Sequence, residues 1–268
     1  MATIIDGKEL SKKLKEQMKD RVAQMRQQGI VPKLVVVLVG NNSASEVYVR
    51  NKPKACGEVG IESEVIKMPE ETNQQELLDV VKGLNEDRTV DGILVQLPRP
   101  GQINEKVVLR SILPEKDVDG FHPVNVGLLS IGDDCYAPAT PSGIIAMFKE
   151  YGIEIAGKHC VIIGRSNIVG KPMAALLLRH NATVTVCHSK TQNLSELTRQ
   201  ADIVIVATGH RHTLTADMVK EGAVVIDVGM NRNELGKLCG HVDFDEVKEK
   251  ASFITPVPGG VGPMPIPD

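Results

Sequence analysis

The stretch "KHCVIIGRSNIVGKPMAALLL", residues 158–178, decides the fold. Its apolar run ends at Gly164, and a helical pattern begins at Gly170 with Pro172 just inside it. Proline is tolerated in a first helical turn, because the N–H group that it lacks has no partner there. The stretch predicts a strand, a turn and a helix whose free N–H groups can hold a phosphate. The spacing departs from GxGxxG, however, and paired glycines also occur in such turns for conformational reasons alone.

The next strand indicates which dinucleotide this turn would bind. Enzymes that use NAD place an acidic residue at the end of the second strand, where it binds the ribose 2′-hydroxyl. This chain has "CHSKT" there, with Ser189 and Lys190 and no carboxylate, and Arg165 lies in the phosphate turn. These side chains suit a 2′-phosphate, so the sequence predicts NADP rather than NAD.

Two later strand ends complete the predicted cofactor site. "VATGH" (206–210) contains Thr208 and Gly209, and "DVGM" (227–230) contains Met230. Both motifs follow apolar runs, at the places where dinucleotide folds bind the nicotinamide half of the cofactor. We therefore expect these residues to contact the cofactor.

Short apolar runs and helical patterns alternate along the chain. Runs rich in Val and Ile occur at 34–40, 63–69, 91–98, 158–164, 182–188, 201–209 and 222–229. Helical spacing of apolar residues occurs at 7–28, 44–59, 73–86, 142–151, 170–180 and 193–200. Continuous apolar strands suit a parallel sheet covered on both faces, and the alternation predicts an α/β fold.

The stretch 114–141, rich in Pro, Gly and Asp, interrupts this alternation, and we place a domain junction there. The prediction is two α/β domains. Residues 1–135, joined by the C-terminal residues 256–268, form the substrate-binding catalytic domain, and residues 136–255 form a Rossmann-like parallel-sheet domain for NADP. Because ligands favour strand ends and domain junctions, we expect the active-site cleft between the two domains.

The composition excludes several classes of protein. The chain has 268 residues, a net charge of −3, 3% aromatic residues and no basic block. A nucleic-acid binder needs a basic surface and aromatic stacking platforms, so we expect no such partner. The five cysteines form no CxxC pair and the histidines show no metal-ligand spacing, which argues against disulfides and metal. With no signal-like or membrane-spanning run in the sequence, we expect a cytoplasmic protein that does not bind membranes.

A tyrosine and a lysine four residues apart are the first candidates for catalysis. Tyr48 and Lys52 lie in "VYVRNKPKAC", and four helical residues turn the chain by about 400°, so both side chains can face one cleft. The pair alone fits a solvated helix face equally well. Short-chain-type dehydrogenases also use Tyr-x-x-x-Lys, but there the pair follows the nucleotide turn, whereas Tyr48 precedes Gly164.

Further candidates lie at a strand end and in two turns. "QLP", with Gln96 and Leu97, ends a strand, which is the usual place for a ligand in an open α/β sheet. In "DVDG", Asp117 is interpreted as a turn or cap residue, and Asp119 is a binding candidate that could equally stabilise its own turn. "PGGVGP" (258–263) presents backbone with little side chain and could close over a flat ligand.

In chain order, these motifs resemble those of one family, the bifunctional methylenetetrahydrofolate dehydrogenase/methenyltetrahydrofolate cyclohydrolases. The resemblance extends over essentially the whole chain and rests on "YVRNKPKAC", "DGILVQLPRP", "PEKDVDGFHPVN", "PATPSGI", "GRSNIVGKP", "CHSKT", "DVGMN" and "TPVPGGVGPM". It implies a homodimer with two activities at one site. The first oxidises 5,10-methylenetetrahydrofolate to 5,10-methenyltetrahydrofolate with NADP, and the second hydrolyses that product to 10-formyltetrahydrofolate.

The resemblance also implies roles for individual residues. Lys52 would be the catalytic lysine and Tyr48 its neighbour over the folate ring, while Gln96 would hydrogen-bond Lys52 and Asp119 would bind the pterin. The implied cofactor contacts are Gly164, Arg165, Ser166, Ser189, Thr208, Gly209 and Met230. The implied substrate contacts are Tyr48, Lys52, Gln96, Leu97, Asp119, Pro258, Gly259 and Gly262.

The residue types fit this chemistry. A pterin presents an amino group and a ring N–H side by side, and one carboxylate, such as that of Asp119, accepts both. Hydride loss leaves a cationic methenyl bridge, which a charged ammonium nearby would oppose. We therefore hypothesise that burial lowers the pKa of Lys52, so that its neutral amine takes a proton from the attacking water.

The sequence departs from the family pattern at two places. Pro53 removes a helical hydrogen bond and disfavours helical geometry in the preceding residue, which predicts a kink or an early break at Lys52. Pro265 stands where the family has Thr, and the sequence ends at Asp268 without the closing helix that the resemblance implies. We expect reduced stability or activity from this, and a monofunctional dehydrogenase or an inactive folate-binding remnant remains an alternative.

Overall fold

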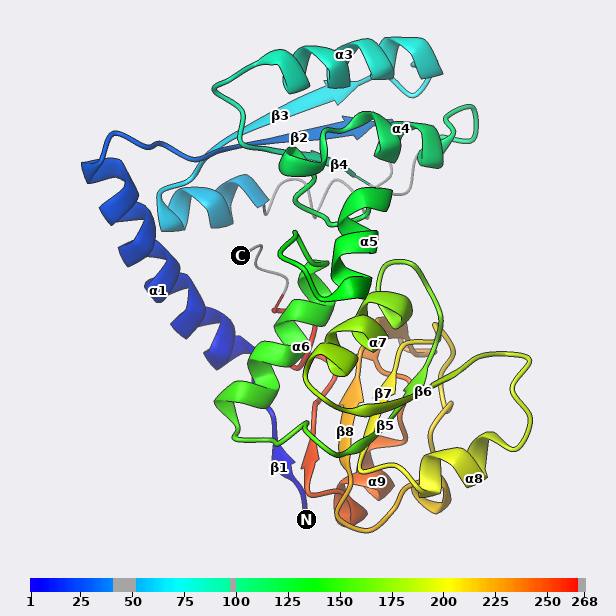
Figure 1. The fold of residues 1–268 in the computed structure, drawn as a ribbon. Coiled ribbons are helices and arrows are strands. Elements are labelled where there is room, and N and C mark those ends of the chain that lie inside the picture. The colour runs from blue at the N-terminus through cyan, green and yellow to red at the C-terminus, as the bar shows by residue number, and fades with distance from the viewer. Residues whose placement is uncertain (41–51, 97–99, 265–268) are drawn as a thin grey trace. The chain divides into compact units, whose positions relative to one another are not determined.

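The computed structural model describes residues 1–40, 52–96 and 100–264, which form two compact units (Figure 1). Unit 1 contains Met1–Lys12, Leu129–Asp133 and the chain from Ala137 onward, and unit 2 contains Lys13–Leu128 and Asp134–Tyr136. The N-terminal residues and the glycine-rich C-terminal segment thus belong to the same unit as the nucleotide motifs. The predicted domain functions, their boundaries and the cleft between them stay predictions.

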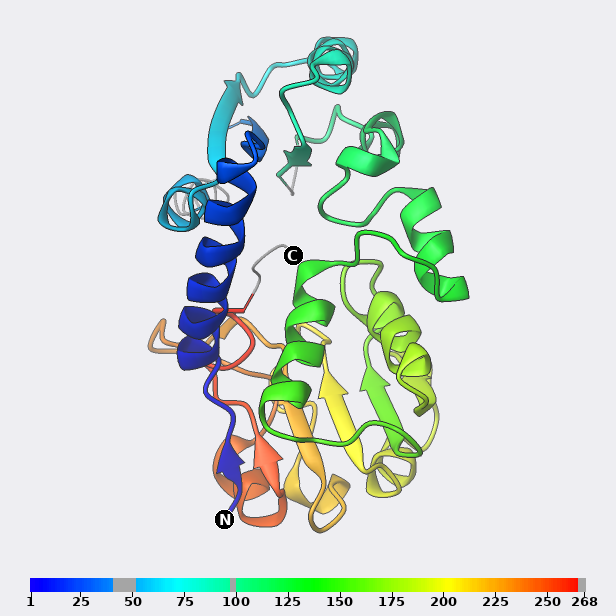
Figure 2. The ribbon, with the colours of Figure 1, turned by 60° about the vertical axis from the view of Figure 1, so that its left-hand side comes forward.

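Unit 1 is built on a parallel sheet with the strand order β1-β11-β8-β7-β5-β6 among the described residues (Figures 1 and 2). Each apolar run predicted as a strand in this half is one. The strands are β5 (His159–Ile163), β6 (Thr183–Cys187), β7 (Ile203–Val206) and β8 (Val224–Asp227), with the short β1 (Thr3–Ile4) and β11 (Phe253–Ile254) at one edge. The sequence did not predict the last two strands, each of which is two residues long.

Helices cover both faces of this sheet, and every residue of β7 and β8 is buried (Figures 1 and 2). On one face, α6 (Ala139–Glu150) packs beside α7 (Gly170–Arg179), which contacts β5 and β6. Side chains of α8 (Leu194–Arg199), the 3₁₀ turn Ala216–Met218 and α9 (Phe244–Lys250) pack into the apolar core on the other face. The predicted α/β fold with a covered parallel sheet is confirmed.

The strand order reverses at β5, because β6 lies on one side of it and β7 on the other. Ligands of such sheets bind outside the carboxyl ends of the strands at this point. Gly164, the residue after β5, passes so close to the backbone after β7 that a Cβ atom would lie 2.3 Å from the carbonyl oxygen of Ala207. Its φ of +135° is also one that residues with side chains rarely adopt. Glycine is therefore required here by both space and conformation.

Unit 2 holds a smaller parallel sheet with the order β3-β2-β4 among the described residues. The strands are β2 (Lys33–Val39), β3 (Glu62–Met68) and β4 (Gly92–Val95). Its helical elements include α3 (Gln74–Glu86), α4 (Glu105–Ser111), the 3₁₀ turn Pro114–Lys116 and α5 (Pro123–Ile131), while α1 (Gly7–Gln27) runs through the boundary of the two units. The stretch predicted as irregular thus contains α5, and the sequence also missed α4, α9 and the hairpin of β9 (Asn231–Arg232) and β10 (Leu238–Cys239).

Residues 52–59 are helical, so Pro53 lies within helical backbone. The residues before Lys52 lie outside the described part of the chain, and the kink or break expected there stays a prediction. Within the described residues, no helix has both the length and the apolar character needed to cross a bilayer.

Replacing Gly164 with Ala should destabilise the fold, because the new Cβ atom would overlap the Ala207 carbonyl oxygen. We expect the free energy of unfolding in urea to fall by about 3 kcal/mol. The matched control is Gly157→Ala, since Gly157 has a φ of +73° but nothing within 4 Å of its Cβ position. That variant should lose only about 1 kcal/mol, and equal losses in the two variants would contradict the close contact.

Candidate active site

Two predicted catalytic residues meet in unit 2. The backbone N–H of Gln96, which follows β4, donates to the carbonyl oxygen of Val37 at 2.9 Å and so holds Gln96 at the carboxyl end of the sheet. From the helical residues 52–59, Lys52 reaches Gln96, and its Nζ donates to Oε1 at 3.3 Å. The predicted hydrogen bond between these side chains is confirmed, while their part in catalysis stays a prediction.

The pKa of Lys52 is lowered from the ordinary lysine value of 10.5, chiefly because burial disfavours the charged ammonium. Attraction to Asp119 and to Cys56, one helical turn further on, opposes this effect, but burial is the larger cause. The expected direction of the pKa shift is confirmed. A lysine with a lowered pKa near a carboxylate is a common feature of functional sites.

Asp119 sits, half-buried, in a turn that a buried carboxylate holds in place. Asp117 is 1% exposed, and its Oδ2 accepts hydrogen bonds from the backbone N–H of His122 at 2.7 Å and from Nδ2 of Asn125 at 2.9 Å. The backbone of Asp117 also pairs with Ile93 of β4. Asp117 is thus a turn residue, as predicted, and it fixes the turn against the strand that leads to Gln96.

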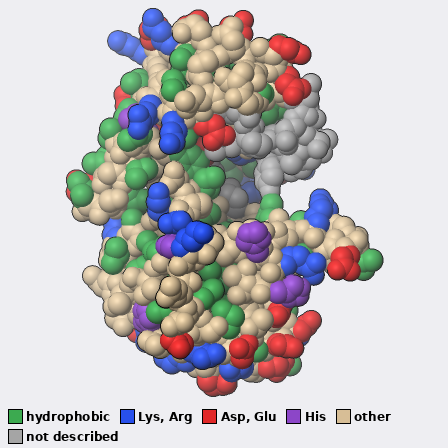
Figure 3. Space-filling model, turned by 90° about the vertical axis from the view of Figure 1, so that its right-hand side faces the viewer, with side chains coloured by type: hydrophobic (Ala, Val, Ile, Leu, Met, Phe, Trp, Pro, Cys, Tyr) green, Lys and Arg blue, Asp and Glu red, His purple; other side chains and the backbone are tan. Residues whose placement is uncertain are grey.

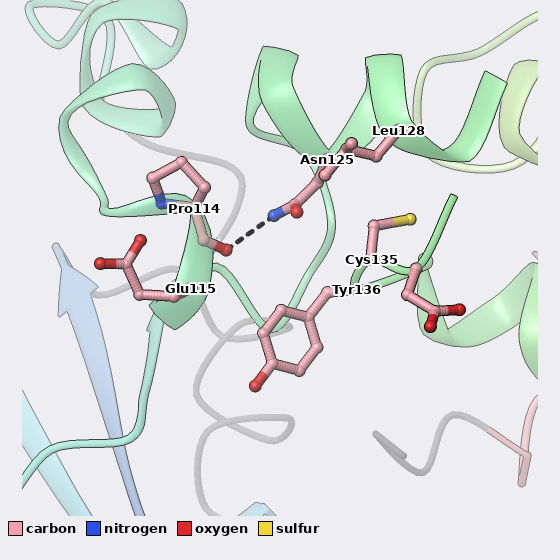
Figure 4. A pocket seen from close by; sticks show the side chains of 7 residues that line it. Pro114, Glu115, Asn125, Leu128, Cys135 and Tyr136 are labelled. Carbon is pink, nitrogen blue, oxygen red and sulfur yellow. Dashed lines mark hydrogen bonds between the residues drawn. The ribbon is translucent and has the colours of Figure 1, made fainter. Parts of the chain in front are cut away.

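The sequence analysis did not single out Asn125, which is 3% exposed. Besides Asp117, its Nδ2 donates to the carbonyl oxygen of Pro114 at 2.9 Å (Figure 4). The available signal was an amide side chain eight residues after Asp117, the predicted turn residue, within the same quoted motif. Asn125 therefore ties α5 to the turn that carries Asp119.

An open hollow of about 420 Å³ lies beside Asn125 (Figure 4). Its lining is Pro114, Glu115, Asn125, Leu128, Asp134, Cys135 and Tyr136. None of these residues is a predicted substrate or cofactor contact, so the hollow does not mark the predicted site.

In unit 1, the predicted phosphate turn and the end of β6 lie side by side. The backbone N–H of Gly164 donates to the carbonyl oxygen of Cys187 at 2.9 Å. Ser166 folds back over the helix start, where its Oγ accepts from the N–H of Val169 at 3.0 Å. Arg165, Ser166 and Ser189 are exposed on the two neighbouring turns, as is Lys190. Figure 3, which faces the side of the molecule where β6 and α8 lie, shows Lys, Arg and His side chains close to one another.

The other predicted cofactor contacts lie at the ends of β7 and β8. Thr208 Oγ1 is 3.0 Å from Oγ1 of Thr213, and the side chain of Met230 is 55% exposed. Gly262 follows the C-terminal turn, and its Cβ position is 3.6 Å from Sδ of Met230. A predicted substrate contact and a predicted cofactor contact are therefore neighbours within unit 1.

The other glycine-rich residues also lie in unit 1. Pro258 is exposed, and Gly259 has a φ of +106° while its carbonyl oxygen accepts from the N–H of Gly7 at 2.9 Å. Tyr48 and Leu97 lie outside the described residues, so their predicted places are not tested. Within the described residues, no group of three or more His, Cys, Asp or Glu side chains could hold a metal ion.

The reversed strand order and the glycine turn between β5 and α7 are typical of dinucleotide-binding α/β proteins. Family models agree with this class and narrow it. Residues 5–119 match the catalytic domain of tetrahydrofolate dehydrogenase/cyclohydrolase, and residues 138–267 match its NAD(P)-binding domain. The chain belongs to the tetrahydrofolate dehydrogenase/cyclohydrolase family.

Individual relatives are similar over nearly the full length. The bifunctional protein FolD of Brevibacillus brevis is 56% identical over 265 residues, which are 99% of this chain and 93% of the relative. The crystal structure of the bifunctional FolD enzyme from Campylobacter jejuni has a TM-score of 0.97 and 54% identity, covering 98% of this chain and 94% of that one. The Trypanosoma brucei FolD structure, which is complexed with NADP cofactor and an inhibitor, has a TM-score of 0.92 and 38% identity. The match covers 98% of this chain and 92% of that one.

The family match confirms the predicted function. The protein is a bifunctional enzyme that oxidises 5,10-methylenetetrahydrofolate and hydrolyses the resulting 5,10-methenyltetrahydrofolate to 10-formyltetrahydrofolate. It also decides against the short-chain-type dehydrogenase, the alternative that the Tyr-x-x-x-Lys spacing left open.

The variant Asn125→Leu tests whether Asn125 holds the Asp119 turn. It leaves the buried Asp117 carboxylate without one of its donors, so we expect a loss of about 2 kcal/mol in urea unfolding. If the turn shifts with it, KM for the folate should rise while KM for the nicotinamide cofactor stays constant.

The matched control is Asn85→Leu. Asn85 also bridges two backbone groups of unit 2, the Ser111 carbonyl oxygen at 2.6 Å and the Leu113 N–H at 3.0 Å, but it does not touch Asp117. This variant should lose similar stability without the selective change in KM. The same KM change in both variants would contradict a specific role for Asn125.

Proposed function

We propose that Lys52 is the base of the hydrolytic step and that Gln96 and Asp119 orient it and the substrate. The observation that carries this proposal is the buried amine of Lys52, with a lowered pKa and a 3.3 Å hydrogen bond to Gln96. Because Gln96 offers Lys52 an oxygen acceptor, a hydrogen of Nζ occupies that direction and the amine is held in one orientation. Tyr48 and Leu97 are proposed neighbours of the folate on the resemblance alone.

The oxidation breaks a C–H bond of the methylene bridge between N5 and N10, and the carbon becomes part of a cationic methenyl bridge. Bound NADP⁺ supplies the acceptor for the hydride that leaves. Asp119 is proposed to accept the amino and ring N–H groups of the pterin, which fixes the bridge carbon. Because burial lowers the pKa of Lys52, the neutral amine is favoured relative to an ordinary lysine, which reduces electrostatic repulsion of the developing cation.

The hydrolysis adds water to the same carbon. The water oxygen forms a bond to the bridge carbon while its proton passes to the neutral amine of Lys52. The bond from that carbon to N5 then breaks as N5 takes up the proton held by Lys52, the added hydroxyl loses its proton to solvent and becomes the carbonyl oxygen, and the formyl group stays on N10. One base thus serves both the addition and the ring opening, since the proton that it gains is available to the departing nitrogen.

The residues of unit 1 fit NADP. The turn after β5 exposes Arg165 and Ser166 just before α7, and the positive end of that helix dipole favours phosphate. Ser189 and Lys190 at the end of β6 add a hydroxyl and a cation and no carboxylate. We propose that Arg165 and Ser189 bind the 2′-phosphate, that Gly164 and Ser166 hold the pyrophosphate, and that Thr208, Gly209 and Met230 border the nicotinamide half. Pro258, Gly259 and Gly262 are proposed to lie along the substrate.

The variant Lys52→Met should lower cyclohydrolase kcat by about 100-fold or more, because it removes the base. In the wild type, the active form is the neutral amine, which exists above the pKa of the folded protein and is lost as the pH falls through it. Cyclohydrolase activity should therefore rise with pH through a value below 10.5, and this titration should disappear in Lys52→Met.

Lys54→Met is the matched control, because Lys54 lies on the same helical segment but is exposed. It should keep both the rate and the pH profile. Full hydrolytic activity in Lys52→Met, or an unchanged titration there, would refute the role of Lys52.

The variant Arg165→Ala should raise KM for NADP by about tenfold and leave KM for NAD nearly unchanged, because only NADP carries the 2′-phosphate. The matched control is Arg199→Ala. Arg199 is an exposed arginine of α8 in the same unit, and it bonds Asp217 in the 3₁₀ turn Ala216–Met218. An equal rise for both cofactors in Arg165→Ala would place the arginine elsewhere on the nucleotide.

We further propose that the enzyme is a homodimer, on the resemblance alone, and that it is cytoplasmic, because its cysteines form no paired pattern and so suit a reducing compartment. Light scattering coupled to size-exclusion chromatography measures the mass directly, and a monomer at working concentration would refute the dimer.

A further inference from the structure

A histidine that the sequence analysis did not single out is buried beside the predicted nicotinamide end of the cofactor site. His241 is 3% exposed, and both of its ring nitrogens are engaged. Nε2 accepts a hydrogen bond from the backbone N–H of Gly209 at 2.9 Å, and Nδ1 is 3.2 Å from the carbonyl oxygen of Val206. These partners specify one tautomer. The Val206 carbonyl oxygen requires a hydrogen on Nδ1, and the Gly209 N–H requires an unprotonated Nε2 as its acceptor.

The backbone of the same histidine belongs to a second cluster around Asp227, the last residue of β8, which is also 3% exposed. The Asp227 carboxylate accepts from the backbone N–H groups of Gly229 at 2.8 Å, His241 at 2.8 Å and Val242 at 3.0 Å. The N–H of Asp227 donates to Thr255 Oγ1 at 2.7 Å. A charged group without water is stable only when such donors surround it, so the turns that supply them are held together.

Two glycines make room for this carboxylate. A Cβ on Gly229 would lie 2.7 Å from Oδ1 of Asp227, and a Cβ on Gly240 would lie 1.9 Å from Oδ2. Gly229 is therefore required by the buried acid of its own chain, in addition to any closeness to a ligand. In the sequence, the acid and both glycines occur in the motifs "DVG" (227–229) and "CGHV" (239–242).

We propose that His241 and Asp227 are positioning residues for the dehydrogenase reaction. His241 sets the turn at Thr208 and Gly209 through Nε2, and Asp227 sets the turn at Gly229 and Met230. Together they hold in place the two backbone turns against which the nicotinamide half binds, without contacting the nicotinamide themselves. This inference rests on the proposed function, which assigns the ends of β7 and β8 to the nicotinamide half of NADP.

The two activities of the enzyme separate this role from general structural support. The hydrolysis does not consume NADP, so a shift of the nicotinamide turns should slow oxidation and leave hydrolysis, assayed without cofactor, unchanged. A loss of folding would lower both activities in the same sample in parallel.

The test compares His241→Gln with His241→Asn. The Gln amide oxygen reaches about as far as Nε2 and can accept from the Gly209 N–H, whereas the shorter Asn amide reaches only the position of Nδ1. We expect His241→Asn to lower dehydrogenase kcat/KM for NADP by about tenfold, which is the effect of losing one hydrogen bond to a neutral group. His241→Gln should stay within about threefold of the wild type. Amide hydrogen exchange at residues 207–210 should be faster in His241→Asn only.

His159→Asn is the matched control. His159 also uses both ring nitrogens, with Nδ1 3.3 Å from the carbonyl oxygen of Gln200 and Nε2 3.0 Å from Thr185 Oγ1, but it lies at the start of β5, the opposite end of the sheet. It should leave the ratio of the two activities unchanged. A parallel loss of both activities in His241→Asn and His241→Gln, or wild-type values in both, would overturn the inference.

The result for Arg165→Ala separates this outcome from a failure of the proposed function. If Arg165→Ala weakens NADP while His241→Asn does not, only the positioning role is wrong. If neither variant affects NADP kinetics, the proposed cofactor site itself is wrong.

Discussion

The close approach of two parallel strands at the point where the strand order reverses is the constraint on which the cofactor site depends. Gly164 and Ala207 touch across this point, and no side chain fits between their backbones. The turn after β5 is thereby brought to the carboxyl edge of the sheet, with its exposed Arg165 and Ser166, and the hydrogen bond from Gly164 to Cys187 places the end of β6 beside it. The proposed recognition of the phosphates and of the ribose substituent therefore depends on the geometry of three adjacent strand ends rather than on any one side chain.

In the other unit, the dominant physical effect is the removal of an amine from water. Burial lowers the pKa of Lys52, and the neighbouring Asp119 offsets only part of that shift. The balance matters for the chemistry, because the substrate becomes cationic during oxidation and then needs a base for hydrolysis. A fully charged lysine would oppose the first step and be unable to accept a proton in the second. In the mechanism that we propose, a lysine whose pKa is lowered by its surroundings serves both steps without a change of residue.

Much of the fold could be predicted from the sequence, and the elements and residues that were missed were missed for physical reasons. Long apolar runs located the central strands, and Gly164, Gly170 and Pro172 located the turn between β5 and α7, because both signals are local. The two-residue strands β1 and β11 were missed, since their pairing joins residues about 250 positions apart and has no local period. His241 and Asn125 were missed for a similar reason. Their importance comes from partners distant in sequence, and an isolated His or Asn in a sequence is more often a solvated residue or part of a turn.

Asp117 and Asp227 show that both units stabilise a turn with a buried, hydrogen-bonded carboxylate. Each is an almost fully buried carboxylate close to a strand end, and each is satisfied by the N–H groups of the turn that carries a predicted site residue. A buried carboxylate without hydrogen-bond donors would lower the free energy of unfolding by several kcal/mol. The turn therefore cannot move without exposing the carboxylate to water or removing its donors. The geometry of the site is thereby coupled to the stability of the fold. This coupling explains why the glycines at 229 and 240 are needed to accommodate the acid, and why the residues that shape such a site need not touch its substrate.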